Sequence, residues 1–170
     1  MAKVLREGYF GWEDSLKIAG TFSSGSTGIM GWTPSFTWIP GQCFKLDPTD
    51  PTYGILCDTI GEQIYGIVMD DDTELAQPPA AMKATVLHGH SLIIIDHTAE
   101  TAAGTVNSAY LAYEKASVEA STPMDLLWTN ASGKLSASTS GSANRPAGFV
   151  TQVPAVGNRY TLRLILFGNR

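Results

Sequence analysis

Residues 86–97 have the sequence VLHGHSLIIIDH, and this short stretch indicates which class of fold to expect. Branched aliphatic residues, which favour extended backbone, stand on both sides of a central glycine. Gly89 can adopt the backbone conformations that a tight reversal requires. The stretch therefore predicts two neighbouring strands, residues 81–88 and 91–97, that reverse at Gly89 and carry histidines at the turn and at the strand edges.

The three histidines of this stretch, His88, His90 and His97, raise the question of a metal site. A His-x-His pair on one strand resembles the pattern of metal-binding barrels of the cupin kind, since alternate side chains point the same way. That pattern requires a glutamate three or four residues later, where this chain has a run of isoleucines. Asp96 does not restore the spacing. We therefore expect structural histidines and no bound metal.

Further short segments, rich in β-branched or aromatic residues and bounded by Pro, Gly or Asp, extend the pattern in both directions. They are residues 43–47 (CFKLD), 53–58 (YGILCD), 63–70 (QIYGIVMD), 126–129 (LLWT), 134–138 (KLSAS), 147–153 (AGFVTQV) and 158–169 (NRYTLRLILFGN). A turn is expected at residues 130–133, NASG. Both faces of the last segment are partly apolar, which predicts a strand covered on both sides.

One segment of the chain favours a helix. Residues from Asn107 to about Val118 are rich in Ala and contain Glu, and apolar positions recur at helical spacing. An alternating strand fits the same residues. The fold class expected is therefore mainly β, a small β-barrel or β-sandwich with one short helix and an extended N-terminal arm.

The two cysteines, Cys43 and Cys57, lie symmetrically about Asp50 in the segment QCFKLDPTDPTYGILCD. A hairpin that turns at PTDPT would bring the two sulfur atoms opposite each other across the strands. Either a cross-strand disulfide or two reduced, buried thiols would fit this arrangement. Reduced thiols are the expected state in a cytosolic product.

Residues 1–40 are rich in Gly and Ser, yet they hold seven of the 16 aromatic residues. Flexible tails are poor in aromatics. Two interpretations remain open: an arm that orders by laying its rings on another surface, or rings that cap the protein's own core. The first interpretation predicts that residues 41–170 fold alone as a barrel-like domain. It also predicts these partner-binding residues: Trp12, Phe22, Trp32, Phe36 and Trp38.

The composition excludes several classes of function. Charged residues make up only 16% of the chain, the net charge is −5, and the 11 Lys and Arg residues are scattered singly, which argues against a nucleic-acid surface. No apolar run approaches the ~18 residues of a membrane span, and the start lacks the apolar core of a signal peptide. No nucleophile elbow, phosphate loop or Cys-x-x-Cys occurs. We therefore expect no catalytic residues and no cofactor.

The closing segment, DLLWTNASGKLSASTSGSANRPAGFVTQVPAVGNRYTLRLIL (residues 125–166), resembles the end of tailed-bacteriophage head decoration, or cement, proteins. In those small β-barrel proteins a strand, a Gly-Lys-Leu type of turn, a Gly-x-Val strand and an alternating final strand occur in this order. The earlier GQCFKL and YGIVMD are similar in kind to their first barrel strands. The resemblance covers roughly residues 40–170 and rests on pattern; residues 1–40 depart from the compact members of the family.

The resemblance implies a non-enzymatic virion protein that is made in the host cytoplasm and binds the outer surface of a capsid. Its partner would be the major capsid protein, and it would self-associate, most often as a trimer, and staple neighbouring capsomers. Two alternatives share parts of the pattern. One is another virion component, a tail or fibre-base protein, and the other is a metal-dependent, cupin-like β-barrel enzyme.

Overall fold

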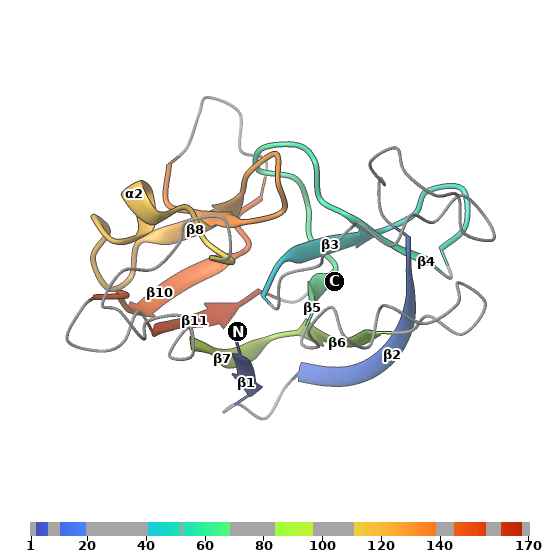
Figure 1. Ribbon diagram of the computed structural model, residues 1–170, viewed down its shortest axis with the longest axis horizontal. Helices are drawn as coiled ribbons and strands as arrows, with labels where there is room; N and C mark the ends of the chain where they lie inside the picture. Colours follow the sequence, from blue (N-terminus) through green and yellow to red (C-terminus); the bar gives the residue numbers. More distant parts are fainter. Residues whose placement is uncertain are drawn as a thin grey trace.

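The computed structural model describes residues 3–6, 11–19, 41–51, 53–68, 84–96, 111–138, 145–155 and 161–167 (Figure 1). Within these residues the fold is mainly β with one short helix, which confirms that part of the predicted fold class. The strands form two groups, a six-stranded sheet and a five-stranded set whose pairings close on themselves.

The six-stranded sheet has the order β1-β7-β11-β10-β8-β9, and all its strand pairs are antiparallel. Its strands are β1 (Lys3–Arg6), β7 (Ser91–Asp96), β8 (Leu126–Thr129), β9 (Leu135–Ser136), β10 (Gly148–Gln152) and β11 (Leu162–Leu166). The expected strands near the C-terminus are therefore present, and the strand expected to be covered, β11, lies between β7 and β10 in the interior of the sheet.

The five-stranded set has the order β2-β4-β3-β5-β6. Its strands are β2 (Gly11–Ala19), β3 (Cys43–Leu46), β4 (Tyr53–Leu56), β5 (Gly66–Val68) and β6 (Ala84–Gly89). The cycle closes because β2 pairs antiparallel with β6 and parallel with β4. The hairpin predicted around PTDPT is confirmed, since β3 and β4 pair antiparallel.

The chain passes from one strand group to the other at Gly89. β6 ends there and pairs with β2 and β5, whereas β7 begins at Ser91 and pairs with β1 and β11. The predicted reversal of these two strands onto each other is therefore wrong. Gly89 has a positive φ of 87°, and this bend redirects the chain into the second sheet. Because β7 is apolar on both faces, an interior place between two strands suits it better than a hairpin edge.

The N-terminal residues that the structure describes belong to the sheets and do not form a separate arm. β1 runs antiparallel to β7, with Lys3 opposite Asp96, and β2 runs antiparallel to β6, with Gly11 opposite Gly89. Figure 1 shows β1 beside β7 and β2 beside β6. The boundary expected at residue 40 therefore does not separate β1 and β2 from the body. Residues 20–40 lie outside the described part of the chain.

The helix is shorter than the composition suggested. α2 comprises Lys115–Val118 alone, and residues 107–110 of the expected helix lie outside the described part. Upstream of α2 the backbone bonds to β9: the carbonyl of Ala112 accepts from the N–H of Leu135 at 2.9 Å, and the N–H of Glu114 donates to the carbonyl of Leu135 at 2.7 Å. These tertiary bonds compete with helical ones, so the helix begins only after Glu114.

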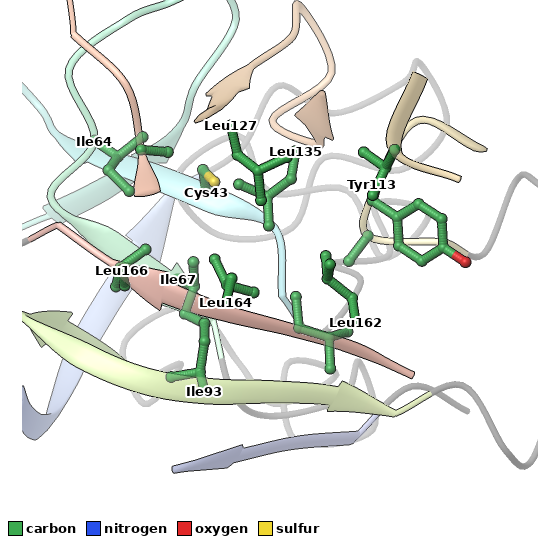
Figure 2. Close-up of a cluster of buried hydrophobic side chains, with 14 of the residues drawn as sticks. Cys43, Ile64, Ile67, Ile93, Tyr113, Leu127, Leu135, Leu162, Leu164 and Leu166 are labelled. Atoms are coloured by element: carbon green, nitrogen blue, oxygen red, sulfur yellow. The ribbon is translucent and has the colours of Figure 1, made fainter. Parts of the chain in front are cut away.

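One hydrophobic core is shared by the two strand groups. Its buried members come from β3, β5, β7, β8, β9, β10 and β11, from α2 and the segment before it, and from the residues that follow β4 and precede β10. Figure 2 shows side chains of β8 and β9 pointing toward those of β7 and β11, with Ile64 and Leu166 at one end of the cluster and Tyr113 at the other. On β11 the inner positions Leu162, Leu164 and Leu166 are fully buried, as the alternation predicted.

The predicted turn at residues 130–133 is confirmed, and it contacts both strand groups. The side-chain Oδ1 of Asn130 accepts from the N–H groups of Ser132 and Lys134 at 2.9 and 3.0 Å, which shapes the turn. The carbonyl of Gly133 then accepts from the N–H of Cys43 at 2.7 Å. Gly133 has a φ of 68° and contacts Leu56 so closely that a Cβ would overlap that side chain.

Candidate interaction surface

A first row of rings lies within the five-stranded set. Phe44 and Tyr65 have ring centroids 5.7 Å apart, and Tyr65 and His88 have centroids 5.0 Å apart. Phe44 is fully buried, whereas Tyr65 and His88 are half-buried, so the row leads from the core toward the surface. Trp12 of β2 stands directly opposite His88 of β6 in the strand register. The predicted partner-binding residue Trp12 is therefore a register neighbour of His88.

A second row of rings lies on the six-stranded sheet. Phe149 and Phe167 have centroids 5.8 Å apart, and Phe167 and His90 have centroids 6.4 Å apart. Both phenylalanines are half-buried and His90 is exposed. The N–H of Phe167 donates to the carbonyl of Ala147 at 2.8 Å, which fixes the end of β11 against the start of β10. Backbone pairing of β10 and β11 positions this row, which is partly accessible.

The second row continues into a line of apolar side chains across four neighbouring strands. Phe149 of β10 pairs with Leu126 of β8 and with Ile165 of β11, and Ile165 pairs with Leu92 of β7. Directly opposed residues of antiparallel strands share a face of the sheet, and the core residues of β11 occupy the other face. Leu126 is 41% exposed and the other three are half-buried. We call Leu126, Phe149, Ile165, Leu92 and Phe167 the outer apolar row.

A strained turn places another large apolar side chain next to β8. The N–H of Asp125 donates to the carbonyl of Thr122 at 3.0 Å, which closes a four-residue turn with Pro123 and Met124 in the middle. Met124 has a φ of 79°, a backbone conformation that favours glycine. Met124 is also 69% exposed. Its N–H donates to the carbonyl of Val150 at 2.7 Å, so the turn is tied to β10.

A polar cluster lies at the β9 end of the sheet face that carries the outer apolar row. The carboxylate Oε2 of Glu114 accepts from the hydroxyls of Ser136 and Ser117, the latter at 3.2 Å, and the two hydroxyl oxygens lie 3.1 Å apart. The Ser117 and Ser136 oxygens also accept from backbone N–H groups of residues 137 and 138 at 3.2 and 3.1 Å. These hydroxyls are engaged in anchoring α2 to β9, which fits a structural role.

Lys45 of β3 forms an ion-pair cluster with two acidic residues of the loop after β4. Lys45 Nζ lies 3.0 Å from Asp58 Oδ1 and also donates to Glu62 Oε1. The hydrogen bond from Lys45 lowers the pKa of Asp58 below its usual value. Burial lowers the pKa of Lys45, but its hydrogen bonds to Glu62 and Asp58 outweigh this effect and raise the pKa. Glu62 Oε2 accepts from the Asp58 N–H at 3.2 Å, so the cluster also fixes the loop.

The histidines do not form a shared site in the part of the chain that the structure describes. His88 contacts Tyr65 and His90 contacts Phe167, which places the two imidazoles in different rows. Among the described residues no group of three or more His, Cys, Asp or Glu side chains is arranged to hold a metal ion. His97 lies outside them. The absence of a bound metal therefore stays a prediction.

The structure describes the position of one of the five predicted partner-binding residues, and the role of all five stays a prediction. Trp12 lies on a described strand, while the other four predicted partner-binding residues, Phe22, Trp32, Phe36 and Trp38, lie outside the described residues. The outer apolar row was missed, although the apolar positions on the second face of residues 158–169 were the signal for it. Met124 carries no such signal, because its importance lies in a backbone dihedral angle.

Comparisons with protein-family models, with curated proteins and with solved structures found no match to this chain. Within the described residues, no helix combines the length and the hydropathy that crossing a bilayer requires.

Proposed function

We propose that the chain is a non-enzymatic virion structural protein that binds the outer surface of a tailed-phage capsid and stabilises contacts between major capsid protein subunits. The observation that carries the proposal is the outer apolar row, which runs over β7, β8, β10 and β11. Three of these strands, β8, β10 and β11, come from residues 125–166, the segment that resembles decoration proteins. Accessible, contiguous apolar side chains are typical of protein contact surfaces.

The geometry of the row suits a staple between subunits. Its side chains stand on interior strands of a sheet, so little conformational freedom is lost when a partner covers them. The low proportion of charged residues, 16%, reduces the desolvation that a wide, dry contact would require. A staple of modest affinity becomes effective when the same contact is repeated around a shell.

We further propose that the protein self-associates as a trimer when it binds. A trimer would present three copies of the outer apolar row and of the Met124 turn to capsomers around a threefold position. Three linked contacts raise the effective affinity without any new type of contact. Sedimentation equilibrium in solution and the copy number per particle measure this directly, and a monomeric mass in both settings contradicts it.

The test of capsid binding is co-sedimentation with purified heads of the phage that encodes the chain. The full-length protein is expected to pellet with heads and to saturate at a fixed ratio. The variant Ile165→Lys places a charge in the centre of the outer apolar row and should weaken binding tenfold or more. The matched control, Ala116→Lys, adds the same charge at an exposed position on α2 and should bind normally.

Circular dichroism of both variants before sedimentation separates lost binding from lost folding. Full-length protein that fails to pellet with heads contradicts the proposal. Pelleting with purified tails, and not with heads, would instead assign the chain to a different part of the virion.

A further inference from the structure

Cys43 and Cys57 face each other at one end of the β3–β4 hairpin. The register pairs Phe44 with Leu56, so the next opposed pair is Cys43 with Cys57. The N–H of Cys57 donates to the carbonyl of Cys43 at 3.2 Å, which ties these two backbones directly together. Opposed residues of an antiparallel pair share a face, and both cysteines are fully buried members of the same core cluster.

This arrangement meets the main geometric requirement of a disulfide. The bond from the Cys57 N–H to the Cys43 carbonyl is one of the two that a hydrogen-bonded antiparallel pair exchanges, and such a pair holds its two Cα atoms about 5.5 Å apart. Disulfides most often join Cα atoms about 5.5–6 Å apart. Both side chains are free thiols in the structure. A bond between them therefore requires side-chain rotation and little movement of the backbone.

The folded hairpin protects the two thiols from reagents. Neither side chain is accessible to solvent, so a small oxidant cannot reach either sulfur while β3 and β4 are paired within the core. Burial also raises the pKa of the Cys43 thiol to about 12, and burial raises the pKa of the Cys57 thiol above its usual value. Because the thiolate is the reacting form, exchange has to proceed from an opened hairpin.

We propose that Cys43 and Cys57 form a reversible intramolecular disulfide by exchange with a small-molecule disulfide such as oxidised glutathione, and that opening of the β3–β4 hairpin controls the reaction. One cysteine thiolate attacks oxidised glutathione, forms a mixed disulfide and releases one glutathione thiolate. The second cysteine thiolate attacks the protein sulfur of the mixed disulfide and releases the other glutathione. The two protein thiols lose two protons and two electrons, and oxidised glutathione is reduced to two glutathione molecules.

The disulfide would cross-link the β3–β4 hairpin where it contacts the six-stranded sheet. The N–H of Cys43 donates to Gly133 of the turn that joins β8 to β9, and Leu56 packs against the same glycine. Closing a loop of about 15 residues restricts the unfolded chain, and the expected result is a rise of about 5–10 °C in the apparent Tm. This inference does not depend on the proposed capsid role.

The experiment exposes the full-length, reduced protein to oxidised glutathione with and without a urea concentration below the unfolding transition. Intact mass after acid quenching identifies the product. The expected product has lost two hydrogen atoms and carries no glutathione, and it forms at least tenfold faster in urea. Dithiothreitol should restore the starting mass and the lower Tm.

The single variants Cys43→Ala and Cys57→Ala are the matched controls, since each leaves one thiol without a resolving partner. Each should retain one glutathione as a mixed disulfide. If the wild type accumulates protein with two glutathiones, or only disulfide-linked dimers, the inference is wrong. If oxidation is equally fast in native buffer and in urea, hairpin opening does not control it. The wild-type product alone decides whether the intramolecular disulfide forms, so poor folding of a variant does not remove the test.

Discussion

His88 and His90 are separated by one glycine, yet their imidazoles contact rings on different strand groups. His88 lies 5.0 Å from the Tyr65 ring centroid, and His90 lies 6.4 Å from the Phe167 centroid. Alternate residues of a regular strand would point the same way. The positive φ of Gly89 interrupts the strand between them, so the His-x-His pattern does not present two ligands to one ion in this structure.

The purified protein should contain no stoichiometric zinc, iron or manganese. Two imidazoles that face different aromatic rings lack a common coordination point, and tight sites need three or four ligands. Inductively coupled plasma mass spectrometry of protein purified without chelator measures the metal content. About one metal ion per chain that disappears in His90→Ala, with folding unchanged by circular dichroism, would overturn this prediction and restore the enzyme alternative.

Gly148→Ala should destabilise the protein strongly. A Cβ at this position would overlap the backbone carbonyl of Ile165, which belongs to the neighbouring strand and cannot rotate away. The expected loss is about 1–3 kcal/mol in the free energy of unfolding, measured by urea denaturation. The control Ala131→Gly makes the reverse change at an exposed turn position and should alter stability by about 0.5 kcal/mol or less. Equal stabilities for the wild type and Gly148→Ala would show that β10 and β11 can separate without cost.

Local patterns predicted the strands that carry their own signal. β11 was predicted by the alternation of Leu162, Leu164 and Leu166, and the 130–133 turn was predicted by its Asn and Gly. Both are short-range properties: side-chain alternation sets one buried face, and turn residues satisfy their own backbone. The same kind of signal could have located the outer apolar row, because the opposite face of β11 carries Ile165 and is followed by Phe167.

Features set by distant partners could not be predicted in this way. β2 has the sequence GWEDSLKIA, without a clean apolar alternation, and it forms because its residues 11–16 pair with β6 and its residues 17–19 pair with β4. Residues 111–114 of the expected helix are not helical because Leu135 bonds to Ala112 and Glu114. Gly89 was correctly identified as a bend, but whether a bend returns a chain to the same sheet depends on which neighbours are present.

Deleting residues 2–19 should impair folding, in contrast to the autonomy expected of residues 41–170. The deletion removes β1 and β2, which leaves one edge of β7 without its partner and opens the five-stranded cycle between β6 and β4. Urea denaturation should show a much lower midpoint or a transition without cooperativity. A synthetic peptide of residues 1–19 added in trans should recover part of the stability. A truncated chain that melts at the wild-type midpoint would instead support the independent arm.

Lys45→Met should flatten the dependence of stability on pH in acid. Lys45 lowers the pKa of Asp58, so the folded state binds this proton less readily than the unfolded state does. The pair therefore contributes stability above the ordinary Asp pKa of about 3.9, and the contribution is lost as the pH falls through the lowered value. Because the Asp58 side chain is 71% exposed, the effect should be modest. Urea midpoints measured between about pH 5 and 2 should converge for the variant and the wild type.

The control for this pH series is Arg145→Met, which removes one positive charge at an exposed position that does not contribute to the pKa shift of Asp58. Its stability should run parallel to that of the wild type across the same pH range. A Lys45→Met curve that also runs parallel would mean that the ion pair has no influence on acid stability.

Met124→Gly should make the protein more stable while weakening its binding to heads. The φ of 79° is strained for methionine and unstrained for glycine, and this relief outweighs the greater freedom of glycine in the unfolded chain. The expected gain is about 0.5–1 kcal/mol by urea denaturation. The exposed side chain stands beside the outer apolar row, so its loss should reduce co-sedimentation with heads.

Met124→Ala separates the two effects, because it removes the same side chain and keeps the strained φ. It should bind heads as weakly as Met124→Gly does but gain no stability. Lower stability in Met124→Gly would show that the side chain packs against its own chain and that the turn is not a contact site. Full binding by both variants would remove Met124 from the proposed surface and leave the outer apolar row to be tested by Ile165→Lys alone.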